Sequence, residues 1–141
     1  MKPGAENSFG GMILCLDRQG KVTVTGAKPV NPEGGIQIDQ FGVRPSPFWQ
    51  GGISFGQANG DLSHNHFKAG RTVDVTCNRH GRGYEFAVTV SMSDSTQARM
   101  TGVEITYTSA GQDRSLTFPV TLFLCPNKIR GSRTCAADDA A

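Results

Sequence analysis

The sequence lacks long apolar runs, helical periodicity and any strong excess of charge. Only 18% of its 141 residues are charged, and the formal net charge is +2, whereas globular domains usually carry about 25% charged residues. Proteins dedicated to nucleic acids concentrate Lys and Arg on one face, so we expect no nucleic-acid partner. No apolar run approaches the roughly 18 residues that a membrane helix needs, so we expect no transmembrane segment.

Recognisable catalytic motifs are missing as well. No Gly-x-Ser-x-Gly sequence marks a nucleophile, and the glycine-rich segments 51–52 and Gly81-Arg82-Gly83 precede no predicted helix that could hold a phosphate. The acidic residues available for paired-carboxylate chemistry fall on predicted outward faces or turns: Asp39, Glu85, Asp94 and Glu104. We therefore expect a protein that is not an enzyme and has no cofactor.

The sequence is instead rich in Gly, with 18 residues, and in Val, Ile, Thr and Phe. This composition is typical of short strands joined by tight turns. Strands are predicted over residues 12–16, 21–25, 36–43, 71–77, 84–92, 97–108 and 115–125, with a further short edge strand at 53–55. Seven to eight short strands without helices predict an all-β fold, an antiparallel two-sheet sandwich.

Local signals predict how these strands are connected. A turn at 17–20 predicts a hairpin between the first two strands, and 27–35, with two prolines and two glycines, is predicted to be a loop. Short connections predict that the last four strands form an antiparallel meander. A change of alternation near Gln40 predicts a bulge, and Pro119 predicts that its strand is bulged or at an edge.

Alternation also predicts which side chains are buried. In strand 84–92 the apolar residues share one face, whereas Glu85, Thr89 and Ser91 are predicted to face water. Val103 and Ile105 belong to the next inward face. We expect a single domain over residues 11–135, with a flexible N-terminal segment at 1–10 and a flexible tail at 136–141.

The four cysteines allow three disulfide pairings. Cys15 and Cys77 share faces with apolar neighbours on their strands, which predicts that they form a bridge in the core. Cys125, at the end of a strand, and Cys135, in a polar tail, are predicted to form a clip. The alternative is four unpaired, buried thiols.

Two disulfides imply an oxidising compartment. We therefore expect an extracellular or cell-surface location. The first residues lack the apolar stretch of a signal peptide, and we expect that a signal has been removed.

Four segments underlie a resemblance to known proteins: Ile38 to Pro45, Tyr84 to Val90, Gly102 to Tyr107 and Leu122-Phe123-Leu124-Cys125. With them the chain resembles small exported β domains of uncharacterised actinobacterial proteins, a resemblance that implies no activity. The architecture also resembles the immunoglobulin-like sandwich, but the motif of antibody domains is absent. Trp49 is too far from Cys15, and Val75 stands where that motif has a Tyr.

Two sets of residues are candidates for a functional site. Trp49, Arg71, Arg79 and Arg82 are a possible binding surface for a protein or carbohydrate partner, although they also fit a core plug and a solvated turn. His64 and His66, if on a strand, point to the same side and are candidate metal ligands, with Asp61 and His80 as possible third ligands. The alternative for these histidines is an exposed polar loop.

The sequence thus favours a non-catalytic, exported β-sandwich that acts in binding or as a structural component. A metal-binding module that uses the His-x-His pair is the alternative.

Overall fold

The structure, a computed structural model, describes residues 7–45, 62–77, 83–93, 97–125 and 129–130. Within these residues the chain forms ten strands, one short 3-10 helix and no α-helix. The elements are β1 (Asn7–Leu14), β2 (Val22–Val30), β3 (Gln37–Pro45), η2 (Leu62–Asn65), β4 (Thr72–Val73), β5 (Tyr84–Ser91), β6 (Ala98–Met100), β7 (Gly102–Ser109), β8 (Gln112–Phe118), β9 (Leu122–Leu124) and β10 (Ile129–Arg130). The all-β prediction is confirmed, whereas the predicted strand count is not.

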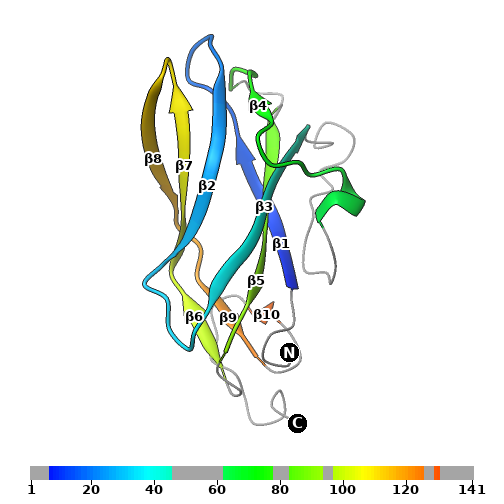
Figure 1. The fold of residues 1–141 in the computed structure, drawn as a ribbon, viewed down its shortest axis with the longest axis vertical. Coiled ribbons are helices and arrows are strands. Elements are labelled where there is room, and N and C mark those ends of the chain that lie inside the picture. The colour runs from blue at the N-terminus through cyan, green and yellow to red at the C-terminus, as the bar shows by residue number, and fades with distance from the viewer. Residues whose placement is uncertain (1–6, 46–61, 78–82, 94–96, 126–128, 131–141) are drawn as a thin grey trace.

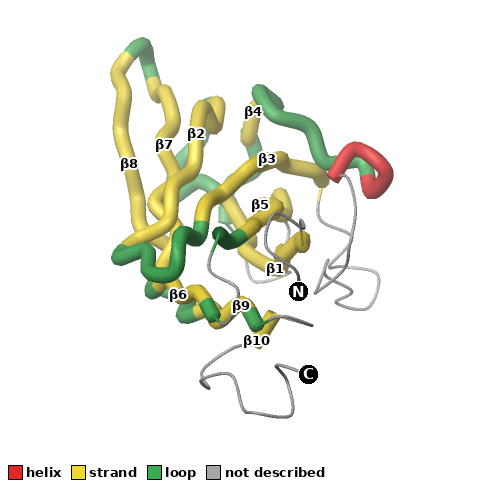
Figure 2. The backbone as a smooth tube through the Cα atoms, turned by 60° about the horizontal axis from the view of Figure 1, so that its bottom comes forward, coloured by secondary structure: helices red, strands yellow, loops and turns green. Residues whose placement is uncertain are grey.

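The strands form three antiparallel sheets (Figure 1), with the orders β1-β5-β3, β4-β2-β7-β8 and β10-β9-β6. Figure 2 shows the strands β2, β7 and β8 beside the β1-β5-β3 sheet, with β6, β9 and β10 along the bottom of the view. One buried apolar cluster draws side chains from all three sheets, among them Met12, Val24, Phe86, Met100, Ile105 and Leu122. The sheets therefore enclose a common core.

β5 is the central strand of its sheet and is buried on both faces. Its core-facing residues Phe86 and Val88 are 0% exposed, as the alternation predicts. Glu85, Thr89 and Ser91 are 0%, 0% and 4% exposed, so the prediction that they face water is wrong. Alternation identifies the more apolar face of a strand, but it does not show whether the other face is covered as well.

The second face of this sheet is covered by the segment after η2. Val43 N donates to Lys68 O at 3.0 Å, and Lys68 N donates to Val43 O at 3.0 Å. Gly42 permits this close approach, because a Cβ at that position would lie 2.8 Å from the Cβ of Phe67. Phe67 joins Ala87 of β5 in a second, smaller buried cluster.

Glu85 is a fully buried charged residue on this second face, and both of its carboxylate oxygens are paired. Arg44 donates to its Oε1 from Nη2 at 2.8 Å and from Nε at 3.1 Å, and Gly11 N donates to its Oε2 at 2.8 Å. The Arg44 guanidinium also lies 4.4 Å from the centroid of the Phe67 ring. A carboxylate can be buried completely only with such partners, and here they join β1 and β3 to β5.

The strand pairings differ from several sequence predictions. The hairpin of residues 12–16 with 21–25 is wrong, because β1 pairs with β5 while β2 pairs with β4 and β7. β1 begins at Asn7, inside the segment predicted to be flexible, and β2 continues to Val30 through part of a predicted loop. β1 and β2 are longer than predicted because they pair with β5 and β7, which are distant in the sequence. Turn signals in the neighbouring residues do not show such pairings.

Two long predicted strands are each divided. Residues 97–108 become β6 and β7, which are separated at Thr101, whose N donates to Val30 O at 2.9 Å. Residues 115–125 become part of β8 and β9, with Pro119 between them. The predicted meander is wrong, because β6 pairs with β9 and β5 pairs with β1 and β3. The bulge near Gln40 is confirmed by a register shift between Ile38 and Gln40.

β7 and β8 form the one hairpin of the predicted meander. Ser109 pairs with Gln112, and the two residues between them, Ala110 and Gly111, have φ values of 51° and 78°. Positive φ at both positions is what a type I′ turn requires, and this turn matches the twist of the strands that it joins. The hairpin therefore presents β8 as a well-formed strand.

In the described part of the chain, no helix has the length and apolar character of a membrane span.

Candidate binding groove

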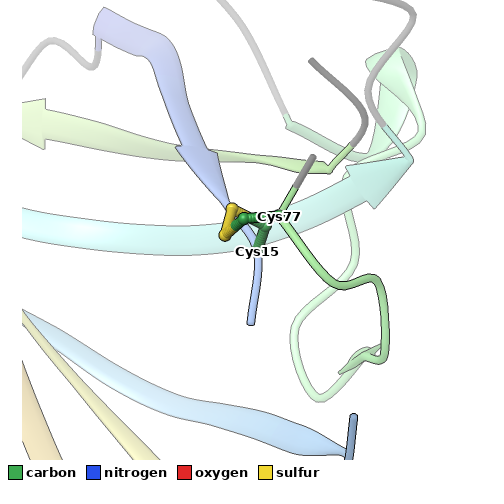
Figure 3. Close-up of a disulfide and its surroundings, with 2 residues drawn as sticks. All are labelled: Cys15 and Cys77. Atoms are coloured by element: carbon green, nitrogen blue, oxygen red, sulfur yellow. A yellow bond between two sulfur atoms is a disulfide. The ribbon is translucent and has the colours of Figure 1, made fainter. Parts of the chain in front are cut away.

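A groove of about 560 Å³ lies between the end of β1 and the β4-β2-β7-β8 sheet. One wall is the segment Leu14–Leu16, which the Cys15–Cys77 disulfide holds with 4.9 Å between the two Cα atoms (Figure 3). Leu16 N donates to Val75 O at 2.8 Å, and Cys77 N donates to Leu16 O at 2.7 Å. Covalent and backbone bonds thus fix this wall.

Apolar side chains of the four-stranded sheet line the groove opposite this wall. Val24, Val73 and Ile105 are 2%, 2% and 1% exposed, and Tyr107 and Leu116 continue the same surface outward. Val24 pairs with Tyr107, and Ile105 pairs with Leu116. Residues that are directly opposite in an antiparallel pair lie on the same face, so these side chains share the inner face of the sheet.

The groove is open because β8 is uncovered. Residues 112–117 are all exposed, including those on the inner face. Leu116 is 40% exposed although its partner Ile105 is buried, and it is the only large hydrophobic side chain in the described ranges that is exposed. The inner surface of the sheet therefore extends outward at β8, beyond the part that the rest of the structure covers.

Charged side chains surround the apolar part. Arg18, Lys21 and Arg114 line the groove together with one carboxylate, Asp17. Arg18 Nε lies 3.5 Å from Asp17 Oδ1, but both side chains are more than 80% exposed, at 85% and 84%, and such surface pairs contribute little. Arg114 Nη2 donates to Gln112 Oε1 at 3.1 Å. Three cations against one carboxylate give the rim a positive balance.

β8 is also an edge strand. The order β4-β2-β7-β8 places it last in its sheet, with no strand outside it among the described residues (Figure 1). An edge strand presents unpaired backbone N–H and C=O groups. The site therefore combines apolar side chains, positive charge and a backbone edge without a described partner strand.

Of the predicted binding surface, Arg71 alone is described. It is half-buried, directly before β4, and does not line the groove. Nearby, Tyr84 donates its hydroxyl hydrogen to Asp74 Oδ1 at 2.8 Å. Burial raises the pKa of Tyr84, the hydrogen bond and charge of Asp74 raise it further, and the charge of Arg71 lowers it.

The other members of that surface are Trp49, Arg79 and Arg82. All three lie outside the described residues. A joint surface of these residues with Arg71 stays a prediction.

The predicted metal pair does not lie on a strand. His64 belongs to η2, and His66 follows it with a φ of 69°. The prediction that both side chains point to one side of a strand is therefore wrong. Across the described ranges, no group of three or more His, Cys, Asp or Glu could hold a metal ion. Asp61 and His80 lie outside those ranges, and the His64–His66 site stays a prediction.

The predicted Cys15–Cys77 disulfide is confirmed. Its predicted place in the core is wrong, because Cys77 is exposed and Cys15 is half-buried beside the groove. Cys125 is buried and also takes part in a disulfide. Cys135 lies outside the described residues, so the Cys125–Cys135 pair stays a prediction.

Sequence reasoning missed the groove because its lining comes from segments far apart, at 14–24, 73 and 105–116. Two signals pointed to part of it. Pro119 predicts an edge strand or a bulge, and Leu116 is an apolar residue between the polar residues Ser115 and Thr117 on that strand.

Comparisons with protein-family models, with curated proteins and with solved structures found no match. Observations that bear on the function therefore come from the structure itself, from the groove and the edge of β8.

Proposed function

We propose that the chain is a non-catalytic, exported β-sandwich domain of immunoglobulin-like architecture that acts by binding. The β1-β5-β3 and β4-β2-β7-β8 sheets are its two layers, and the β10-β9-β6 sheet continues the second layer, because only Thr101 separates β6 from β7. The core cluster shared by the three sheets supports this layering. Consecutive strands such as β1 and β2 lie in different sheets, as crossover connections between the layers of a sandwich require.

The groove is the observation that supports binding most directly. Its volume of about 560 Å³ lies within the usual range for ligand sites, and Leu116 offers an apolar contact that the domain itself leaves exposed. The backbone edge of β8, which has no described strand outside it, can form a ladder of hydrogen bonds with an extended polypeptide but not with a sugar. We therefore favour a protein partner over a carbohydrate.

An oxidising environment supports the export of the domain. Disulfides persist outside the cytosol and are rare within it, and Cys15–Cys77 holds one wall of the groove. The proposed place of action is the cell surface or the extracellular medium, where the exposed Cys77 stays oxidised.

Photo-crosslinking in the organism that produces the protein tests this proposal. p-Benzoylphenylalanine in place of Leu116 is expected to give a discrete adduct with a partner protein. The matched control places the same group at Lys28, which is exposed on the opposite face of the same sheet and pairs with Glu104. The proposal requires an adduct from position 116 that is absent from position 28, and that disappears when Arg114→Glu is introduced beside the photo-reactive group. Equal labelling from both positions, or none from either, would refute it.

A further inference from the structure

The edge of β8 that has no neighbouring strand in the described structure is an ordered surface to which another strand can add. β8 is seven residues long, from Gln112 to Phe118, and the type I′ turn at Ala110 and Gly111 holds it in register with β7. An extended chain that is already ordered loses little conformational entropy when another strand joins it. Strand addition to exposed sheet edges is a common mode of peptide recognition.

The hairpin register indicates which backbone groups point outward. The residues that flank a two-residue turn form a hydrogen-bonded pair, and such pairs alternate along an antiparallel ladder. Since Ser109 pairs with Gln112, we expect Asp113, Ser115 and Thr117 to direct their N–H and C=O groups away from β7. A row of donors and acceptors along one side of β8 follows.

The inner face beside this row has a definite chemistry. Arg114 and Leu116 are two residues apart, are paired with Tyr107 and Ile105, and line the groove. A strand laid along β8 would place one of its side chains opposite Arg114 and another, two positions away, opposite Leu116. An acidic and an apolar side chain fit these two places.

We infer that β8 is the acceptor for an extended segment of a partner protein, which adds to the sheet as an antiparallel strand with an acidic residue opposite Arg114 and an apolar residue opposite Leu116. Charge identifies this occupant, because Arg18, Lys21 and Arg114 outnumber Asp17 around the groove. The inference rests on the proposed binding function and names the partner's chemistry.

A second copy of this chain fits the edge less well. In a two-fold antiparallel pair of β8 strands, each Arg114 would oppose an uncharged residue or another Arg114, because the only acidic residue of β8, Asp113, is on the other face. Self-pairing would therefore leave each Arg114 without a carboxylate opposite it on the inner face. A heterologous acidic strand neutralises Arg114 instead.

A synthetic peptide of seven residues, the length of β8, tests the inference. The sequence Val-Thr-Val-Thr-Glu-Thr-Thr places Val opposite Phe118 and Leu116 and Glu opposite Arg114 in an antiparallel pair. The matched control has Lys in place of Glu. Titration of isotope-labelled protein, followed by NMR, is expected to shift the backbone amides of β8 and to slow their exchange with solvent for the Glu peptide, with about tenfold weaker binding of the Lys peptide.

Variants of the protein give the decisive comparison. Arg114→Glu is expected to reverse the preference between the two peptides, and Ser115→Pro to abolish binding of both, because Pro removes an outward N–H that an edge strand can lose without unfolding. Lys28→Glu, on the opposite face, is expected to change neither.

Three outcomes would overturn strand addition. Shifts confined to Leu14, Leu16 and Tyr107 without protection of β8 would place the peptide in the groove but not on the edge, and the proposed binding function would survive. Equal affinity for the Glu and Lys peptides would remove the assigned charge preference. Ultracentrifugation that showed a dimer, converted to a monomer by Ser115→Pro, would replace the acidic partner with a second copy.

Discussion

β5 and β8 are both antiparallel strands of similar length, but they have opposite environments. Seven of the eight residues of β5 are buried, whereas six of the seven residues of β8 are exposed. β5 pairs on both sides, with β1 and β3, and β8 pairs only with β7 in the described structure. A strand that is paired on both sides and rich in apolar residues is thus buried, whereas the more polar β8 has one edge without a described partner.

The contrast extends to charge. Glu85 on β5 is 0% exposed and has three hydrogen bonds from Arg44 and Gly11. Asp113 on β8 is exposed. A buried charge without partners is costly, whereas an exposed charge is solvated by water. Substitution of the two carboxylates should therefore give very different results.

The largest effect is expected for Glu85→Ala. It leaves the half-buried guanidinium of Arg44 and the N–H of Gly11 without their acceptor, which should lower the free energy of unfolding by about 3–5 kcal/mol. Asp113→Ala, the matched change on β8, should change it by about 0.5 kcal/mol or less. Urea denaturation followed by circular dichroism measures both.

A double variant separates the charge from the packing. Arg44→Leu with Glu85→Leu removes both charges, so it should be less destabilising than Glu85→Ala alone, because no unpaired guanidinium remains. If Glu85→Ala and Asp113→Ala had similar small effects, the role of the Arg44–Glu85 pair in joining β1, β3 and β5 would be disproved.

A smaller effect of opposite sign is expected for Thr89→Val. Thr89 Oγ1 is buried and has no hydrogen-bond partner in the described structure, so the hydroxyl carries a desolvation cost without compensation. Valine has nearly the same shape, and the change should raise the free energy of unfolding by about 1 kcal/mol. Thr117→Val on β8 is the control, since its side chain is exposed and the change should be nearly neutral.

The same urea titrations give this comparison. Destabilisation by Thr89→Val would contradict this prediction. It would mean that the buried Thr89 hydroxyl makes a hydrogen bond in the folded protein.

Part of this contrast could be predicted from the sequence. The pairing of Cys15 with Cys77 is predicted correctly, although from an inward placement that the structure contradicts, because Cys77 is exposed. The alternation in residues 84–92 predicts the core face of β5, because alternation is a local pattern. The bulge near Gln40 is predicted for the same reason, because a change in the alternation of apolar and polar residues can be recognised from consecutive residues.

What could not be predicted depends on contacts between distant residues. Gly11 and Arg44 reach Glu85 across 74 and 41 positions of the chain, so nothing near Glu85 in the sequence shows that it is buried. The groove has the same property, since Leu14 and Leu116 line it together although β1 and β8 belong to different sheets. Local periodicity predicts a strand but not its neighbours.

The smallest effect concerns pH and the start of β5. Burial raises the pKa of Tyr84 above its ordinary value of 10.0, and the hydrogen bond to Asp74 adds to the shift. In the unfolded chain the phenol loses its proton near 10.0, while in the folded protein it keeps the proton to higher pH. Above that value the folded state binds more protons, so the free energy of unfolding must fall as pH rises through this interval.

Tyr84→Phe removes this titration, so the variant should lose less stability than the wild type between about pH 9 and about pH 11. Asp74→Asn should have an intermediate effect, because it removes the negative charge that disfavours the phenolate but leaves the phenol half-buried. Urea midpoints at the two pH values, compared across the three proteins, test the order. An identical alkaline decline in all three would show that Tyr84 titrates alike in the folded and unfolded chains, and that the start of β5 does not bury its phenol.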